Sequence, residues 1–143
     1  MLSIFPQFLD FQFYGPLFLR VALGIIFIAH GWKKISGGKE SRAQFAGWLG
    51  AMKIRPGKFW ALVVTLVEFF GGVLLFVGFF VQPIALVLSI QFLVILFWVR
   101  RGQPFIAKPD APMMSWEFDF LIFFALVALL VLGPGACAID LPL

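Results

Sequence analysis

Two charged residues interrupt segments of the chain that are otherwise almost entirely apolar. Glu68 stands within LVEFFGGVLLFVGFF (Leu66–Phe80), where every other residue is apolar or glycine, and Arg20 stands within the apolar segment that begins at Pro16. A carboxylate in such surroundings can hold a cation, accept a hydrogen bond from a ligand or carry a proton. Because an opposite charge nearby keeps both groups ionised, we expect Arg20 and Glu68 to form a buried salt bridge.

Further polar residues in apolar segments extend this set. Gln91 is expected at about the depth of Glu68, and His30, the only histidine, suits either proton transfer or a hydrogen-bonded structural role. Glu117 and Asp119 are two residues apart and point to roughly opposite helix faces. We expect Glu117 to face inward and Asp119 to stabilise the helix N-terminus by its charge. The candidates for ligand binding or proton relay are Arg20, His30, Glu68, Gln91 and Glu117.

Several chemistries lack the residues that they need. The chain has one cysteine, Cys137, and no Cys-x-x-Cys motif, which excludes a disulfide-exchange cycle run by this chain alone. One histidine cannot supply two axial haem ligands, and no cluster of cysteine and histidine predicts a metal site. No glycine-rich phosphate loop and no nucleophile elbow is present. No catalytic residue is identified, and whether the chain is an enzyme stays open.

The composition places these residues in a membrane. The sequence is 62% hydrophobic and 13% charged, and 20 of its 143 residues are phenylalanine. Soluble domains are about 45–50% apolar and about 25% charged. A water-soluble protein of this length could not bury so much apolar surface, so the lipid bilayer is the expected solvent. The net charge of +4 comes from basic residues clustered between apolar segments, which argues against nucleic-acid binding.

Four segments are long and apolar enough to cross the bilayer, which takes roughly 20 residues per helix. Because backbone groups find no partner in hydrocarbon, each span must be helical. We expect a single domain over residues 1–143, an all-α bundle of four transmembrane helices with antiparallel neighbours. Residues 39–53 predict a short amphipathic helix in the membrane interface or, alternatively, a lid on the bundle end. The expected spans are Pro16–Ile35, Phe59–Val81, Pro83–Val99 and Trp116–Leu132.

Glycines share the helix faces of the buried charges, and small residues let helices approach closely. Glu68 is expected about 13 Å into its span, near the midplane, where a lone charge costs on the order of 3 kcal/mol. Arg20 is expected about 6 Å deep from the outer side, and its long side chain can reach further along the bundle. The two faces should therefore pack around the Arg20–Glu68 pair. The glycines expected at this helix packing are Gly24, Gly31, Gly71 and Gly72.

Basic residues indicate the orientation, because cytoplasmic loops carry an excess of lysine and arginine. Ten of the eleven lysines and arginines flank the first and third connections. We therefore expect loops 36–58 and 100–115 on the cytoplasmic side and both termini outside, in a multi-pass protein of the cell (cytoplasmic, inner) membrane. The ten residues are Lys33, Lys34, Lys39, Arg42, Lys53, Arg55, Lys58, Arg100, Arg101 and Lys108.

The order of these features resembles the DoxX family of small integral membrane proteins over nearly the whole chain. The stretches that carry the resemblance are LRVALGIIFIAHGWKKISGG, FAGWLGAMKIRP, LVEFFGGVLLFVGF and WEFDFLIFFALVALLVLGPGACAID. The resemblance implies a four-helix integral membrane protein, and some relatives are described as membrane subunits of thiosulfate:quinone oxidoreductase or as partners of thiol and superoxide defence proteins. Relatives with cysteine pairs suggest thiol carriers, and this sequence departs from them. The shared positions that it implies are Arg20, His30, Gly31, Glu68, Gly71, Gly72, Glu117, Gly133, Pro134, Gly135 and Asp140.

Three functional hypotheses remain. The first is a redox-associated membrane subunit that binds a quinone or another lipophilic molecule beside Arg20, Glu68 and Gln91, with a membrane or peripheral redox protein as partner. The second is a small transporter or pore component, which would require a homo-oligomer or a small substrate because four helices enclose little volume. The third is a membrane scaffold without catalysis, in which the Arg20–Glu68 pair is structural. The sequence does not choose among them.

Overall fold

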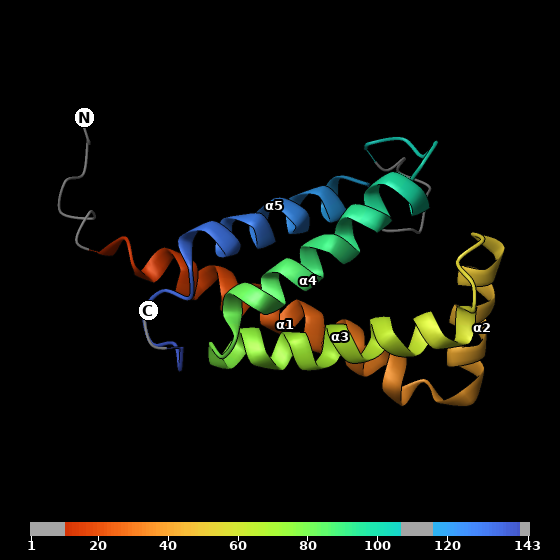
Figure 1. Ribbon diagram of the computed structural model, residues 1–143, viewed down its shortest axis with the longest axis horizontal. Helices are drawn as coiled ribbons and strands as arrows, with labels where there is room; N and C mark the ends of the chain where they lie inside the picture. Colours follow the sequence, from red (N-terminus) through yellow and green to blue (C-terminus); the bar gives the residue numbers. More distant parts are fainter. Residues whose placement is uncertain (1–10, 107–115, 141–143) are drawn as a thin grey trace.

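The computed structural model describes residues 11–106 and 116–140, and its regular secondary structure over these ranges is entirely helical (Figure 1). No residue in the described ranges belongs to a β-strand. Residues 107–115 of the predicted third connection, with Lys108, lie outside them. The elements are α1 (Tyr14–Ser36), α2 (Gly38–Ala51), α3 (Gly57–Val77), α4 (Val81–Val94), the π-helix η2 (Ile95–Val99) and α5 (Trp116–Leu132).

Three helical segments are long and apolar enough to cross a membrane: α1, α3 and the continuous segment Val81–Val99 that α4 and η2 form. The fourth expected span is α5, a strongly apolar helix of 17 residues. Its length corresponds to about 26 Å, against a hydrocarbon core of about 30 Å. Length and composition identify a multi-pass membrane protein, so the predicted all-α membrane class is confirmed.

The break between the second and third expected spans lies earlier than the sequence predicts. α3 ends at Val77, Gly78 takes a left-handed conformation with φ 76°, and α4 begins at Val81. The sequence places the break at Gln82 because Pro83 is expected to begin the next helix. Pro83 instead lies third in α4, and proline is tolerated in a first turn because the N–H groups there have no intrahelical partner.

The bundle consists of two helix pairs, because α1 packs along α3 and α4 packs along α5. The pairs lie close together at the end where α5 finishes and diverge toward the end that α2 covers (Figure 1). α2 packs on the beginning of α3 through Ala46, Leu49 and Ala61. The divergence separates the two pairs near α2, and six polar side chains line the space between the pairs there.

Glycines permit the close contact between α1 and α3. A Cβ atom at Gly24 would lie 2.9 Å from the carbonyl oxygen of Gly72, and one at Gly72 would lie 2.7 Å from the backbone nitrogen of Ile28. Gly31 is equally confined, since its Cβ position is 2.7 Å from Phe69. Any side chain at these three glycines would push the two helices apart.

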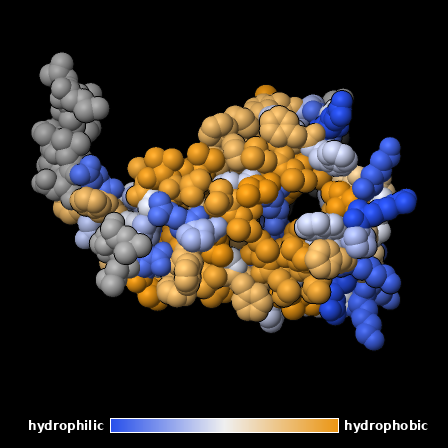
Figure 2. Space-filling view, viewed as in Figure 1, coloured by the Kyte–Doolittle hydropathy of each residue, from blue (hydrophilic) through white to orange (hydrophobic). Residues whose placement is uncertain are grey.

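The core between the two pairs is aliphatic and aromatic. Phe27 of α1 and Phe92 of α4 meet edge to face, with ring centroids 5.7 Å apart. Gly71 faces α4 rather than α1, because a Cβ atom there would lie 3.3 Å from Ile84. Many large apolar side chains lie on the outer surface (Figure 2), as contact with lipid requires. The other buried core residues are Leu23, Leu75, Val81, Ala85, Leu88, Ile122, Leu126 and Leu129.

Arg20 is buried at the end of the bundle away from α2, where it binds main-chain carbonyl groups. Its guanidinium donates hydrogen bonds to Pro134, Ala136 and Cys137 at 3.1, 3.0 and 2.7 Å. It also donates to the carbonyl oxygen of Phe76 in α3 at 2.9 Å. Through these hydrogen bonds, Arg20 of α1 holds the segment that follows α5 against both α1 and α3.

Asp140 connects the same segment to the beginning of α4 by hydrogen bonds. Its two carboxylate oxygens accept hydrogen bonds from the backbone N–H groups of Phe80 and Val81, each at 2.7 Å. Its own N–H donates to the carbonyl oxygen of Gly78 at 2.9 Å. A carboxylate at this position satisfies donors that have no partner within the helix and complements the positive helix end.

The predicted salt bridge between Arg20 and Glu68 is wrong. α1 and α3 run in opposite directions along their glycine contact, so Arg20 lies beside Phe76. Phe76 is eight positions from Glu68, which corresponds to about 12 Å along the helix. Arg20 instead donates to carbonyl groups of the segment after α5, whose position the sequence alone does not reveal.

Candidate functional site

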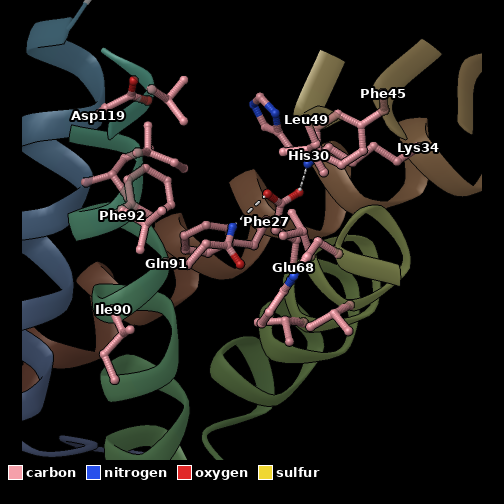
Figure 3. A pocket seen from close by; sticks show the side chains of 18 of the residues that line it. Phe27, His30, Lys34, Phe45, Leu49, Glu68, Ile90, Gln91, Phe92 and Asp119 are labelled. Atoms are coloured by element: carbon pink, nitrogen blue, oxygen red, sulfur yellow. Dashed lines mark hydrogen bonds and ion pairs between the residues drawn. The ribbon is translucent and has the colours of Figure 1, made fainter. Parts of the chain in front are cut away.

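Glu68 lies on α3 with its side chain 9% exposed, and both of its carboxylate oxygens are bound by neighbouring helices. Oε2 lies 2.5 Å from Nζ of Lys34, which comes from the last turn of α1. Oε1 accepts a hydrogen bond from Nε2 of Gln91 on α4 at 2.9 Å. Figure 3 shows the two contacts converging on the carboxylate, which therefore joins three helices.

Lys34 belongs to this candidate site, although in the sequence it is predicted only to indicate topology. Its ammonium lies 4.6 Å from the centroid of the Phe45 ring on α2 and is also paired with Glu68. The desolvated position over an aromatic ring stabilises a cation. A signal for Lys34 was available, because it follows His30 by four residues and therefore shares its helix face.

A cavity of about 530 Å³ lies between the two helix pairs at the α2 end. Its lining is predominantly apolar, with Phe27, Phe92 and Ile122 contributed by α1, α4 and α5. The polar side chains that line it come from four helices and from the residue that follows η2. They are His30, Lys34, Glu68, Gln91, Asp119 and Arg100.

The cavity opens on the apolar side of the molecule. Trp60 of α3 and Val87, Ile90 and Val94 of α4 line the cavity, and each is also between 42% and 53% exposed on the outer surface. Figure 2 shows the surface hollowed between α3 and α4 at this position, with mostly apolar and some polar side chains around it. A lipophilic molecule could therefore enter sideways from the membrane without passing through water.

A second ion pair lines the same cavity. Nε of Arg100 lies 2.6 Å from Oδ2 of Asp119, and the two side chains are 10% and 8% exposed. Arg100 directly follows η2, and its N–H donates to the carbonyl oxygen of Ile95 at 2.9 Å. The pair joins the end of η2 to the first turn of α5.

The prediction that Glu117 faces the interior is wrong, because Asp119 is buried and Glu117 is exposed. Asp119, Ile122, Leu126 and Leu129 form the buried face of α5. Large aliphatic side chains on a transmembrane helix are equally suited to contact with lipid. α5 instead buries them against α4, because a bundle core in a membrane is as apolar as the surrounding lipid.

The structure brings together three of the five predicted site residues. His30, Glu68 and Gln91 line one cavity (Figure 3), whereas Arg20 lies at the other end of the bundle and Glu117 on its surface. His30 is half-buried, and its ring makes no hydrogen bond to any residue in the described ranges. The imidazole is therefore available to a molecule in the cavity.

The polar lining offers complementary hydrogen-bonding groups to a ring that carries oxygen atoms. Lys34 and His30 can donate to a carbonyl oxygen, and Glu68 can accept from a hydroxyl. In residues 11–106 and 116–140, no group of three histidine, cysteine, aspartate or glutamate side chains could hold a metal ion. The arrangement is therefore that of an apolar binding cavity with a few convergent polar groups.

Comparison with known proteins gives both a family and named relatives. A family model described as DoxX matches residues 15–101. The chain is 31% identical over 126 residues to a Bacillus subtilis (strain 168) protein named "Putative oxidoreductase CatD", with 88% of this chain and 84% of that protein covered. It is 27% identical over 130 residues to a Haemophilus influenzae protein named "Uncharacterized protein", with 89% of each covered. No solved structure matches the chain.

Proposed function

Because this chain belongs to the DoxX family, we propose that it is a redox-associated membrane subunit that binds a quinone-like lipophilic molecule in the cavity beside Glu68 and Gln91. The observation that carries the proposal is the Glu68 carboxylate, held by Lys34 and Gln91 in an apolar cavity. The volume of about 530 Å³ lies within the range of about 300–1,000 Å³ that small-molecule sites occupy. The oxidoreductase name of the Bacillus relative supports the redox association.

The residues present fit a quinone-like group. A carbonyl-bearing ring is apolar on its faces, as are Phe27 and Phe92, and polar only at its oxygen atoms. Lys34 and His30 would donate to one oxygen, and Glu68 would accept from it when it carries a proton. A bound quinone supplies the capacity to take up or release electrons, and the protein's own groups would hold protons at Glu68 and His30.

We also propose that α5 is the fourth span of the bundle and that the α2 end faces the cytoplasm. The support for α5 is its apolar composition and its packing along α4 through Leu126 and Leu129. The support for the orientation is the gathering of basic residues at the α2 end. With this orientation the cavity lies in the cytoplasmic half of the membrane, within reach of a peripheral redox protein.

The direct test is to extract the purified protein with organic solvent and identify co-purifying small molecules by mass spectrometry. A second measurement uses Trp48 and Trp60, which line the cavity, as fluorescent reporters for added decyl-benzoquinone. We expect saturable quenching, with the dissociation constant raised about tenfold or more by Glu68→Gln. Arg42→Gln, on the exposed face of α2, is the matched control and should not change it. The absence of both a co-purified molecule and saturable quenching would contradict the proposal.

A structural role is the second candidate, because the Glu68 carboxylate connects α1, α3 and α4. In that case the protein is a membrane scaffold and Glu68 serves to hold its helices together. The Glu68→Gln variant separates the two candidates. A variant that is less stable but binds decyl-benzoquinone with unchanged affinity favours the scaffold, whereas a variant that folds normally and loses affinity favours the binding site.

A further inference from the structure

The ion pair of Arg100 and Asp119 lies on the side of the cavity opposite the Lys34–Glu68 pair. Figure 3 shows Asp119 on α5, across the cavity from Lys34 and His30 on α1. The walls between the two pairs are apolar and include Phe92. The cavity therefore has two polar ends and an apolar middle.

The Arg100–Asp119 pair has hydrogen-bonding capacity left over. Asp119 uses Oδ2 for Nε of Arg100, and Arg100 uses Nη1 to donate to Gln103 at 3.1 Å. Among residues 11–106 and 116–140, Oδ1 of Asp119 and Nη2 of Arg100 have no hydrogen-bond partner. Both side chains are about nine-tenths buried. Neither of these two atoms is fully enclosed, since Ser89 Oγ is the fully buried side-chain atom without a partner in the described ranges, so each keeps accessible surface at which a ligand could bind.

The backbone supplies an independent observation at the same place. η2 is a π-helical turn that leads directly into Arg100, and its hydrogen bond from Arg100 to Ile95 spans five residues. Single π-turns are rare and frequently occur at functional sites. A further hydrogen bond holds this turn. The indole N–H of Trp98 donates to the carbonyl oxygen of Met52, the residue that follows α2, at 2.9 Å.

We propose that Arg100 and Asp119 form a second polar subsite that binds a hydroxyl group at the far end of the cavity ligand. A guanidinium beside a carboxylate offers a donor next to an acceptor, and a hydroxyl group matches both because it accepts and donates. The inference rests on the proposed binding cavity and narrows its ligand to molecules with a polar group at each end of an apolar body. A lipid with one polar group would occupy only one of the two ends.

Two probes with the same body test the proposal: decylhydroquinone, and a decyl-methoxyphenol in which one hydroxyl is capped. Their dissociation constants are measured by isothermal titration calorimetry in detergent under anaerobic conditions. We expect the wild-type protein to bind the dihydroxy probe about tenfold or more tightly, since a hydrogen bond to a charged group is lost with the cap. We expect Asp119→Asn to abolish this preference for the dihydroxy probe. We expect Glu68→Gln to lower the affinity for both probes.

Controls separate binding from folding. Asp119→Asn leaves Arg100 without its ion partner and could therefore disturb folding. The double variant Arg100→Met with Asp119→Leu removes both charges together, and proteins often tolerate such a replacement of a buried ion pair. It should fold and bind both probes equally. Glu117→Gln, on the exposed face of the same helix turn, should retain the preference. Equal wild-type affinity for the two probes, or a preference that survives both variants, overturns this inference alone. Failure of the wild-type protein to bind either probe overturns the proposed cavity function and this inference with it.

Discussion

The ammonium of Lys34 lies 2.5 Å from the carboxylate of Glu68, and this contact joins the end of α1 to the middle of α3 beside the cavity. The two residues are 34 positions apart in the chain. The side chain of Lys34 is 24% exposed and that of Glu68 is 9% exposed, so the pair lies between the bundle interior and the basic end of the molecule. The cation that pairs with Glu68 is therefore Lys34, at the α2 end of the bundle, and not Arg20, at the opposite end.

The first prediction concerns the stability of this pair. Lys34→Met should destabilise the protein by about 1–3 kcal/mol, because it leaves an oxygen of the buried Glu68 carboxylate without its hydrogen-bonding cation. Lys34→Met combined with Glu68→Gln should recover much of that loss, since no uncompensated charge remains. The thermal unfolding midpoint of the detergent-solubilised protein measures both effects. Additive destabilisation in the double variant would show that the two side chains do not interact.

The second prediction concerns the glycine contact between α1 and α3. Gly24→Ala should destabilise the protein by about 1–3 kcal/mol, because its Cβ atom would lie 2.9 Å from the carbonyl oxygen of Gly72. Gly47→Ala in α2 is the matched control, since no atom lies within 4 Å of its Cβ position. It should be neutral or slightly stabilising, as alanine favours helix over glycine. Equal effects of the two substitutions would contradict the close packing.

The third prediction concerns the hydrogen bonds by which Arg20 holds the segment after α5. Arg20→Lys should cost on the order of 3 kcal/mol, because one ammonium cannot replace a guanidinium that binds carbonyl groups of α3 and of residues 134–137. Cys137 lies in this segment, is the only cysteine and is exposed, so the mobility of a nitroxide spin label attached to it reports release of the segment. The mobility of the label should rise in Arg20→Lys and not in Arg42→Lys. Unchanged mobility with unchanged stability would show that the carbonyl contacts are dispensable.

The fourth prediction concerns orientation in the membrane. If the termini lie outside, a membrane-impermeant maleimide should label Cys137 in intact cells, or in spheroplasts where an outer membrane is present. A cysteine introduced at Lys39 in α2, in a Cys137→Ser background, should react only after the membrane is permeabilised. Reversed labelling of the two positions would reverse the proposed topology and move the cavity to the other side of the membrane.

The helical fold was largely predictable because lipid imposes one backbone solution on each long apolar segment. The expected second span and the observed α3 differ by two residues at the start and four at the end. The glycines at positions 24, 31 and 72 were found for a similarly local reason, since a small residue on the face of a buried charge indicates helix contact. His30, Glu68 and Gln91 stood out because polar residues in apolar helices are expensive and rare.

The pairing of these residues could not be read from the chain. Partner choice depends on how far each antiparallel helix is displaced along its neighbour, and the observed displacement places Arg20 beside Phe76, eight positions along α3 from Glu68. It also depends on the segment after α5, which brings its carbonyl groups to Arg20 over more than 110 positions. The face that α5 buries was likewise undecided, because the core and the surrounding lipid are both apolar and hydropathy does not distinguish them.

The sequence by itself therefore determined the solvent, the helices and the polar residues that need explanation, because these follow from the local free energy of placing each residue in hydrocarbon. Only the tertiary structure decided that Lys34 and Gln91 hold Glu68, that Asp119 faces inward with Arg100, and that the helix pairs diverge around a cavity. These features depend on the packing of side chains between helices, a property of the assembled bundle that no single segment carries.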